Sequence, residues 1–201
     1  KLIDNLNIRL SDCRSLGIVG ENGSGKTTFV QLLSEALMPT KGKIEIEISK
    51  RIPVISVLNQ FPERMLGSNT LEQLLNKLIE NNRFDPHLIK SFEKKLKSNQ
   101  IIWNKVKNKR SLNLSWSVVR IVLVIILSLS SSSLIVLDEP TFGLGFQQKI
   151  KLSQILKSML INKHLILVSH DTEFVRNHCD KILDFDTKTI LQNDKILNYA
   201  K

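Results

Sequence analysis

The chain has 201 residues, of which 42% are hydrophobic and 24% charged, a composition typical of a globular protein with one substantial core. Its formal net charge is +10 at pH 7, from 29 Lys and Arg against 19 Asp and Glu. The two cysteines, Cys13 and Cys179, exclude a disulfide framework and favour a reducing, cytosolic compartment. The most apolar stretch, residues 121–127, is too short to span a bilayer, which takes about 20 apolar residues, so we expect it in the core.

The first third of the chain has the pattern of strands around one loop and one helix. We expect strands over 7–10 and 16–19, then a helix from the loop to about Leu37 and a turn at 39–42. Residues 43–48 alternate strictly between apolar and polar, which predicts a half-buried strand, and 53–58 predicts another.

The middle of the chain is helical in character. Thr70 and Gln73 form a capping box ahead of leucines spaced for one helical face, and Asp85-Pro86 predicts the start of a second helix. A third segment, 115–129, suits a helix or a strand, because its β-branched content leaves the period undecided.

From residue 134 the α/β pattern returns. We expect a buried strand over 134–137, a long helix with Ile150, Ile155, Leu156 and Met159 on its apolar side, a strand over 164–168, and shorter strands near 181–185 and 189–197. The predicted fold class is α/β: a P-loop NTPase core with a mainly parallel sheet and an N-terminal antiparallel β part. The core would be formed by 1–61 and 131–201, with an inserted helical subdomain at 62–130.

Residues 20–27 read Gly-Glu-Asn-Gly-Ser-Gly-Lys-Thr, a complete phosphate-binding loop of the form GxxxxGK[ST]. Its glycines let backbone N–H groups approach phosphate oxygens, Lys26 is placed to reach the β- and γ-phosphates, and the Thr27 hydroxyl can ligate Mg²⁺. The alternative, a chance glycine-rich turn, does not account for the apolar strand before the loop and the helix after it. The predicted nucleotide-binding residues are Asn22, Gly23, Ser24, Gly25, Lys26, Thr27 and Thr28.

Further polar residues follow three predicted strands, at the ends where α/β sheets bind ligands. The 134–137 strand delivers Asp138, suited to the Mg²⁺ shell, and Glu139, which can act as general base on the water that attacks the γ-phosphate. Gln60 follows a strand at the sheet edge, and His170 follows the 164–168 strand. A lone histidine is more often a surface or core residue, but His170 faces the same predicted crevice.

The charge excess is concentrated between residues 81 and 110. Nine basic residues lie there against only Asp85 and Glu93: Arg83, Lys90, Lys94, Lys95, Lys97, Lys105, Lys107, Lys109 and Arg110. One interpretation is a surface for lipid headgroups, RNA or an acidic protein; the other is a solvated helical face. Because no aromatic residues interleave in stacking fashion, the pattern does not favour a nucleic acid partner.

Taken together, these motifs resemble the ATP-binding cassette (ABC) family over nearly the whole chain. GENGSGKTT is similar to the Walker A motif, Gln60 to the Q-loop, LIVLDEPT to the Walker B motif with its catalytic glutamate, and His170 to the switch histidine. The Gln60-Phe61-Pro62-Glu63 sequence and Phe142-Gly143-Leu144 are most similar to the ATPases of energy-coupling-factor importers.

The resemblance implies that ATP and Mg²⁺ are bound and that Glu139, His170 and Gln60 act in hydrolysis, with Thr27, Gln60 and Asp138 as metal ligands. It also implies a second ABC ATPase subunit or domain and an integral membrane transporter subunit as partners. The location it implies is cytoplasmic, peripheral on the inner face of the cell membrane.

The chain departs from the family pattern at the signature motif LSGGQ, which begins a helix before the Walker B aspartate. The residues there are Leu114, Ser115, Trp116, Ser117 and Val118. Both glycines and the glutamine are missing, although the family's backbone N–H groups at this helix start approach the γ-phosphate bound by the partner. Gly145 stands where the family's D-loop has aspartate, and the sequence begins too late to show the aromatic residue that stacks on adenine upstream of the family's first strand.

The sequence therefore leads to three hypotheses. In the first, the chain is an importer ATPase that works as the unequal half of a heterodimer or of a two-cassette polypeptide, because its own Walker motifs are intact and its signature is degenerate. In the second, it is a soluble ABC protein that acts on ribosomes or nucleic acid through the basic 81–110 segment. In the third, the divergence marks relaxed constraint and low activity.

Overall fold

The computed structural model describes residues 13–62 and 66–193, in which a six-stranded sheet has the order β2-β3-β4-β1-β5-β6. The pairings among the first five strands of this order are parallel, whereas β6 pairs antiparallel with β5, and the fold class predicted from the sequence is confirmed. The strands are β1 (Ser15–Val19), β2 (Ile55–Leu58), β3 (Leu134–Asp138), β4 (His164–Val168), β5 (Lys181–Asp184) and β6 (Thr189–Gln192).

Several helices begin at a side-chain cap that the sequence offers. Thr70 and Gln73 form the predicted capping box, Asp85 accepts a hydrogen bond from the His87 N–H, and Ser115 caps the 116–129 segment, which is therefore a helix. The α-helices are α1 (Lys26–Leu33), α3 (Leu71–Glu80), α4 (Ile89–Ser98), α5 (Trp103–Val106), α6 (Trp116–Leu129), α7 (Phe146–Met159) and α8 (Thr172–Arg176), with short 3₁₀ helices at Pro86–Leu88 and Ser111–Asn113.

The sheet separates two hydrophobic clusters, because successive side chains of a strand point to opposite faces. In β3, Leu134 and Val136 pack in a cluster with Val30 and Leu33 of α1, whereas Ile135 and Leu137 pack in the larger cluster with α6 and α7. Strands buried on both faces read as continuous apolar runs. This is the reason that β1, β3 and β4 could be recognised from the sequence.

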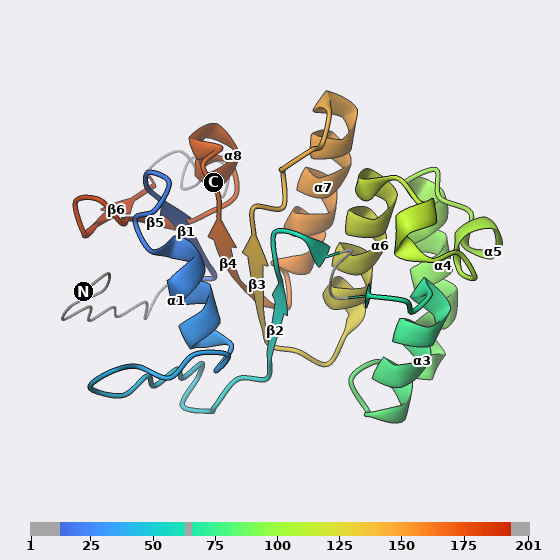
Figure 1. The fold of residues 1–201 in the computed structure, drawn as a ribbon, viewed down its shortest axis with the longest axis horizontal. Coiled ribbons are helices and arrows are strands. Elements are labelled where there is room, and N and C mark those ends of the chain that lie inside the picture. The colour runs from blue at the N-terminus through green and yellow to red at the C-terminus, as the bar shows by residue number, and fades with distance from the viewer. Residues whose placement is uncertain (1–12, 63–65, 194–201) are drawn as a thin grey trace.

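The helices between β2 and β3 form a group beside the sheet. Figure 1 shows α3, α4 and α5 gathered at the end of the molecule remote from β1 and β5, with α6 between them and α7. Phe84 and Trp103 each pack edge-on to the ring of Phe92, at centroid distances of 6.1 and 5.0 Å. These helices lie in the segment expected as an inserted helical subdomain. None of the helices that the structure describes is long and apolar enough to cross a membrane.

One predicted helix end and one predicted strand are wrong. The first helix ends at Leu33 instead of about Leu37, where Glu35 has a φ of 57° and Leu37 and Met38 are exposed, so no buried face sustains another turn. Residues 43–47 form no strand: the described residues here make only a bridge between Ile48 and Arg51.

The alternation of residues 43–48 corresponds to partial burial of two of its three isoleucines without a hydrogen-bonded ladder, since Ile44 is 41% exposed. Ile46 and Ile48 pack against the core, but a pair of strands without further neighbours is marginal in water. The strand expected over 7–10 and the end of the one expected over 189–197 lie outside the described residues. Ile150 is 39% exposed, whereas Ile155, Leu156 and Met159 are buried as expected.

Candidate nucleotide-binding site

The phosphate loop lies between β1 and α1, at the carboxyl end of the central strand. Gly25 precedes α1 with a φ of 104°, and no side chain caps this helix, so its first N–H groups remain available to an anion. Gly20 and Gly23 also have positive φ angles, of 148° and 87°. A side chain at Gly23 would meet no atom within 4 Å, so its backbone is open to an approaching ligand.

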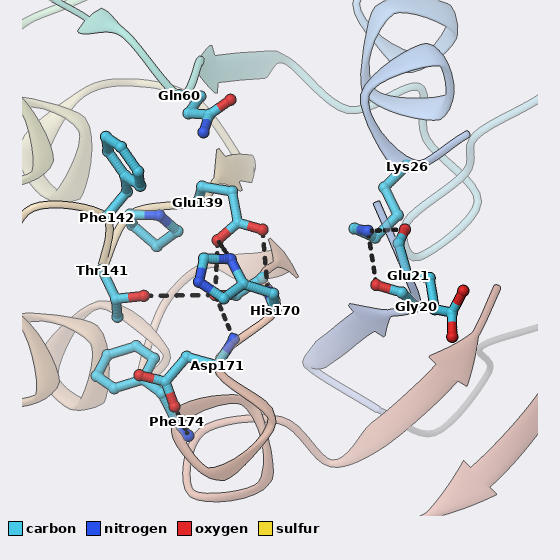
Figure 2. A network of polar contacts seen from close by, with 12 residues as sticks. Gly20, Glu21, Lys26, Gln60, Glu139, Thr141, Phe142, His170, Asp171 and Phe174 are labelled. Carbon is cyan, nitrogen blue, oxygen red and sulfur yellow. Dashed lines mark hydrogen bonds and ion pairs between the residues drawn. The ribbon is translucent and has the colours of Figure 1, made fainter. Parts of the chain in front are cut away.

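Lys26 turns back onto its own loop. Its Nζ atom donates hydrogen bonds of 2.7 Å to the carbonyl oxygens of Gly20 and Glu21, as Figure 2 shows. The loop is further tied to the sheet edge, since the Glu21 N–H donates to the Asp186 carboxylate at 2.8 Å. The Lys26 ammonium group, which the sequence predicted to bind phosphate, therefore binds two backbone carbonyl oxygens in this structure.

An unsatisfied hydroxyl supports the nucleotide assignment. Ser24 Oγ is the one buried side-chain oxygen or nitrogen without a hydrogen-bond partner in the described part of the chain, and it belongs to the loop. A buried polar atom without a partner costs about 1–3 kcal/mol, and a phosphate oxygen would remove that cost. A triphosphate thus fits the loop, with Asn22 and Thr27 exposed on it.

Asp138 ends β3 and is 4% exposed. Burial, together with the neighbouring charge of Glu139, raises the pKa of Asp138 to about 6, and the positive charge of Lys26 opposes the rise. Within the described ranges, no group of three or more His, Cys, Asp or Glu side chains could hold a metal by itself. Mg²⁺ usually takes one or two protein ligands plus phosphate oxygens and water, so Asp138 and Thr27 fit such an ion.

Glu139 is held from several directions at the carboxyl end of β3. Its carboxylate accepts hydrogen bonds from the His170 N–H at 2.9 Å and from Ser169 Oγ at 3.0 Å, and His170 Nδ1 lies 2.8 Å away (Figure 2). The Glu139 backbone has a φ of 48°, a left-handed conformation that costs a non-glycine residue about 1–3 kcal/mol. The surrounding contacts therefore fix both the side chain and a strained backbone.

His170 lies beside Glu139, as its place after β4 predicted, and its side chain is 60% exposed. The next residue, Asp171, caps α8 through the Phe174 N–H and pairs with Lys149 of α7 at 2.6 Å. Burial alone would raise the pKa of Asp171, but the hydrogen bonds from Lys149 and the Phe174 N–H, together with the positive charge of Lys149, hold it below its usual value. These contacts connect the His170 turn to the start of α7.

Gln60 follows β2 and lies on the same side of the site as Glu139, across from Lys26 (Figure 2). Its backbone carbonyl accepts a 2.7 Å hydrogen bond from Arg120, which is 1% exposed in α6. The other terminal nitrogen of Arg120 donates to the carbonyl oxygens of Glu139, Pro140 and Phe142. One buried guanidinium thus contacts the segment after β2, which carries Gln60, and the turn after β3, which carries Glu139.

The degenerate signature begins α6 and lies away from the phosphate loop of this chain. Ser115 caps the helix, and the following Trp116 is 48% exposed. The Trp116 ring packs with Phe61 and Phe142 at centroid distances of 6.5 and 6.3 Å. A large aromatic side chain therefore fills the helix start where the family pattern has glycine.

Sequence reasoning missed three residues of this site: Arg120, Ser169 and Asp186. Arg120 had a visible signal, since it is the only charge inside the apolar run of 118–127. Ser169 stands directly before His170, and it is 0% exposed. Asp186 gave no signal, because its contact with Glu21 joins residues that are 165 positions apart.

A phosphate loop after β1 of a parallel sheet, a histidine after the neighbouring β4 and two carboxylates at the end of β3 beyond it define a P-loop nucleotide-binding protein of the cassette type. The model of the ABC transporter family matches residues 3–142, and the chain belongs to this family of ATP-binding ATPases.

Several known proteins are similar to the chain. The energy-coupling factor transporter ATP-binding protein EcfA2 of Staphylococcus aureus (strain USA300) is 27% identical over 198 residues, which cover 90% of this chain and 68% of the relative. An archaeal ribosome recycling factor, aABCE1, solved with ribosomal stalk protein aP1, is 25% identical with a TM-score of 0.66; the match covers 85% of this chain but only 31% of that one. A putative metal-chelate type ABC transporter, 21% identical, has a TM-score of 0.69 over 90% of this chain and 73% of its own.

Proposed function

We propose that the chain is an ATP-hydrolysing subunit or domain that powers solute import by a membrane transporter, as the unequal partner of a heterodimer. One observation carries the proposal: Glu139 and His170 of its own half-site contact each other, while Trp116 occupies the helix start that it would present to a partner's nucleotide. The similarity to an energy-coupling factor ATPase supports the import role. The chain would lie in the cytoplasm against the inner face of the membrane.

In this proposal, the loop residues 22–28 hold the triphosphate, and Thr27, Asp138 and Gln60 hold Mg²⁺, which supplies charge neutralisation at the phosphates. Glu139 takes a proton from the attacking water, a general-base role that contributes about 10²–10⁴ in rate. His170, beside that carboxylate, orients Glu139. Positioning and electrostatics account for most of phosphoryl transfer, so the fixed backbone of Glu139 matters directly.

The asymmetry follows from the start of α6. Helix N-terminal N–H groups bind anions only when the backbone can come close, and the indole of Trp116 prevents that approach. A homodimer would then contain two damaged composite sites. A heterodimer with a cassette that carries an intact signature would contain one complete site, built from the Walker motifs of this chain and the signature of its partner.

ATP turnover by the purified chain, alone and co-expressed with a cassette that carries an intact LSGGQ motif, tests the proposal. We expect turnover by the pair at least about tenfold above that of the chain alone, since the missing backbone donors are of the kind whose loss costs about 10²–10³ in rate. Robust turnover by the unmodified homodimer would refute the asymmetric model.

The alternative function, action on ribosomes or nucleic acid, has one observation in its favour. Lys90, Lys94 and Lys97 form an exposed stripe along α4. The aromatic residues of the same segment, however, are buried in the core: Phe84, Phe92 and Trp103. They cannot stack on bases. Co-sedimentation with ribosomes, against co-purification with membrane subunits in detergent, separates the two functions.

A further inference from the structure

We propose that the first turns of α6 act within this chain, as a clamp that holds the Gln60 segment against the turn carrying Glu139. Arg120 is the central positioning residue of the clamp, and Trp116 closes it from outside. The inference deepens the proposed function, because it rests on Glu139 as the catalytic base.

The polar half of the clamp is a buried guanidinium shared between two segments. Arg120 donates through one nitrogen to the Gln60 carbonyl oxygen at 2.7 Å and through the other to the carbonyls of Glu139 and Pro140, at 3.3 and 3.4 Å, and of Phe142. Removing a charge from water is costly, and an apolar side chain of similar volume would satisfy packing alone. The guanidinium instead holds together two backbone segments that are far apart in the sequence.

The aromatic half of the clamp involves the same two segments, through the rings of Phe61 and Phe142. Phe61 follows Gln60, and its ring lies edge-on to that of Phe142 at a centroid distance of 5.8 Å. Trp116 packs on both rings. Trp116 and Arg120 are four residues apart in α6, so they lie on one helical face. A single face of α6 therefore contacts both segments twice.

The turn that is held needs such support. Glu139 has a left-handed backbone, and its carbonyl oxygen accepts from both Arg120 and the Phe142 N–H. A strained conformation persists only where its surroundings over-determine it. Loss of Arg120 would let the turn relax and move the Glu139 carboxylate, and a displacement of about 1 Å can cost as much as about 10²-fold in rate.

Hydrogen exchange tests the clamp without relying on hydrolysis. In the full chain, Arg120→Met should increase exchange in peptides covering 58–62 and 139–144 together, with the β1 and β4 peptides unchanged. Arg51→Met, the same change at an exposed residue between α1 and β2, is the matched control. If Arg120→Met does not fold, the same exchange measurements are made on Arg120→Lys and on Trp116→Ala, which changes a half-exposed residue.

Turnover then separates positioning from general support. In the assembly that hydrolyses ATP, Arg120→Met should lower kcat by about tenfold or more, leave KM for ATP within about twofold, and lower kcat no further in a Glu139→Gln background. Unchanged exchange at both segments, or exchange increased equally throughout the chain in every variant, would overturn the clamp. If Glu139→Gln leaves turnover intact, the proposed function fails, while the exchange result still decides whether the clamp exists.

Discussion

The substitution Glu139→Gln should separate catalysis from folding. The carboxylate accepts hydrogen bonds from the His170 N–H and Ser169 Oγ, and it faces His170 Nδ1. A glutamine amide can keep its oxygen on the His170 N–H and donate its NH₂ group to the Ser169 hydroxyl and to a neutral imidazole nitrogen. All three contacts can be remade, so we expect the free energy of unfolding to change by less than about 1 kcal/mol.

Turnover should respond differently, because an amide cannot accept the proton of the attacking water. Loss of a general base costs about 10²–10⁴ in kcat, equivalent to about 3–5 kcal/mol of barrier. Single-turnover hydrolysis is measured in the assembly that hydrolyses ATP, while binding of a fluorescent ATP analogue and urea denaturation are measured on the purified chain. Glu173→Gln, which changes an exposed carboxylate of α8, is the matched control. Turnover within threefold of the unmodified protein, with ATP still bound, would exclude Glu139 as the base.

Two further predictions concern buried basic groups. Lys163 donates 2.6 Å hydrogen bonds to the carbonyls of Ser130 and Ser132. Lys163→Met should therefore lower the free energy of unfolding, measured by urea denaturation, by about 2–4 kcal/mol. A decrease no larger than that caused by the exposed Lys157→Met would contradict this. Burial lowers the pKa of His178; as pH falls through about 6.5 the unfolded chain takes up the proton first, so stability should decline by at most about 1.4 kcal/mol per pH unit for this group. His178→Gln should flatten that decline, and an equal effect of the exposed His87→Gln would refute the assignment.

The sequence predicted the elements whose signal is local. The strands β1, β3 and β4 are continuous apolar runs, and α3 follows a capping box that lies within four residues. The 115–129 segment could not be decided, because Ile and Val suit both helices and buried strands. Its cap at Ser115 and its burial on all sides, Arg120 included, make it a helix in the structure.

What the sequence could not predict depends on contacts between distant residues. Residues 43–48 alternate like a strand, yet a strand also needs hydrogen-bonded neighbours, which alternation does not report. Gln60, Glu139 and His170 were expected near one edge of the sheet because each follows the carboxyl end of a predicted strand. The link that Arg120 makes between Gln60 and Phe142 spans 60 residues in one direction and 22 in the other, and no local pattern encodes it.

The two hydrogen bonds that Lys26 makes to Gly20 and Glu21 have a consequence for binding strength. An ammonium group has three donors, of which these bonds use two, so a phosphate that takes more than one donor must displace a carbonyl, and for that donor only the difference between the two contacts favours the nucleotide. The same competition favours release, since the lysine has acceptors within reach when a product leaves.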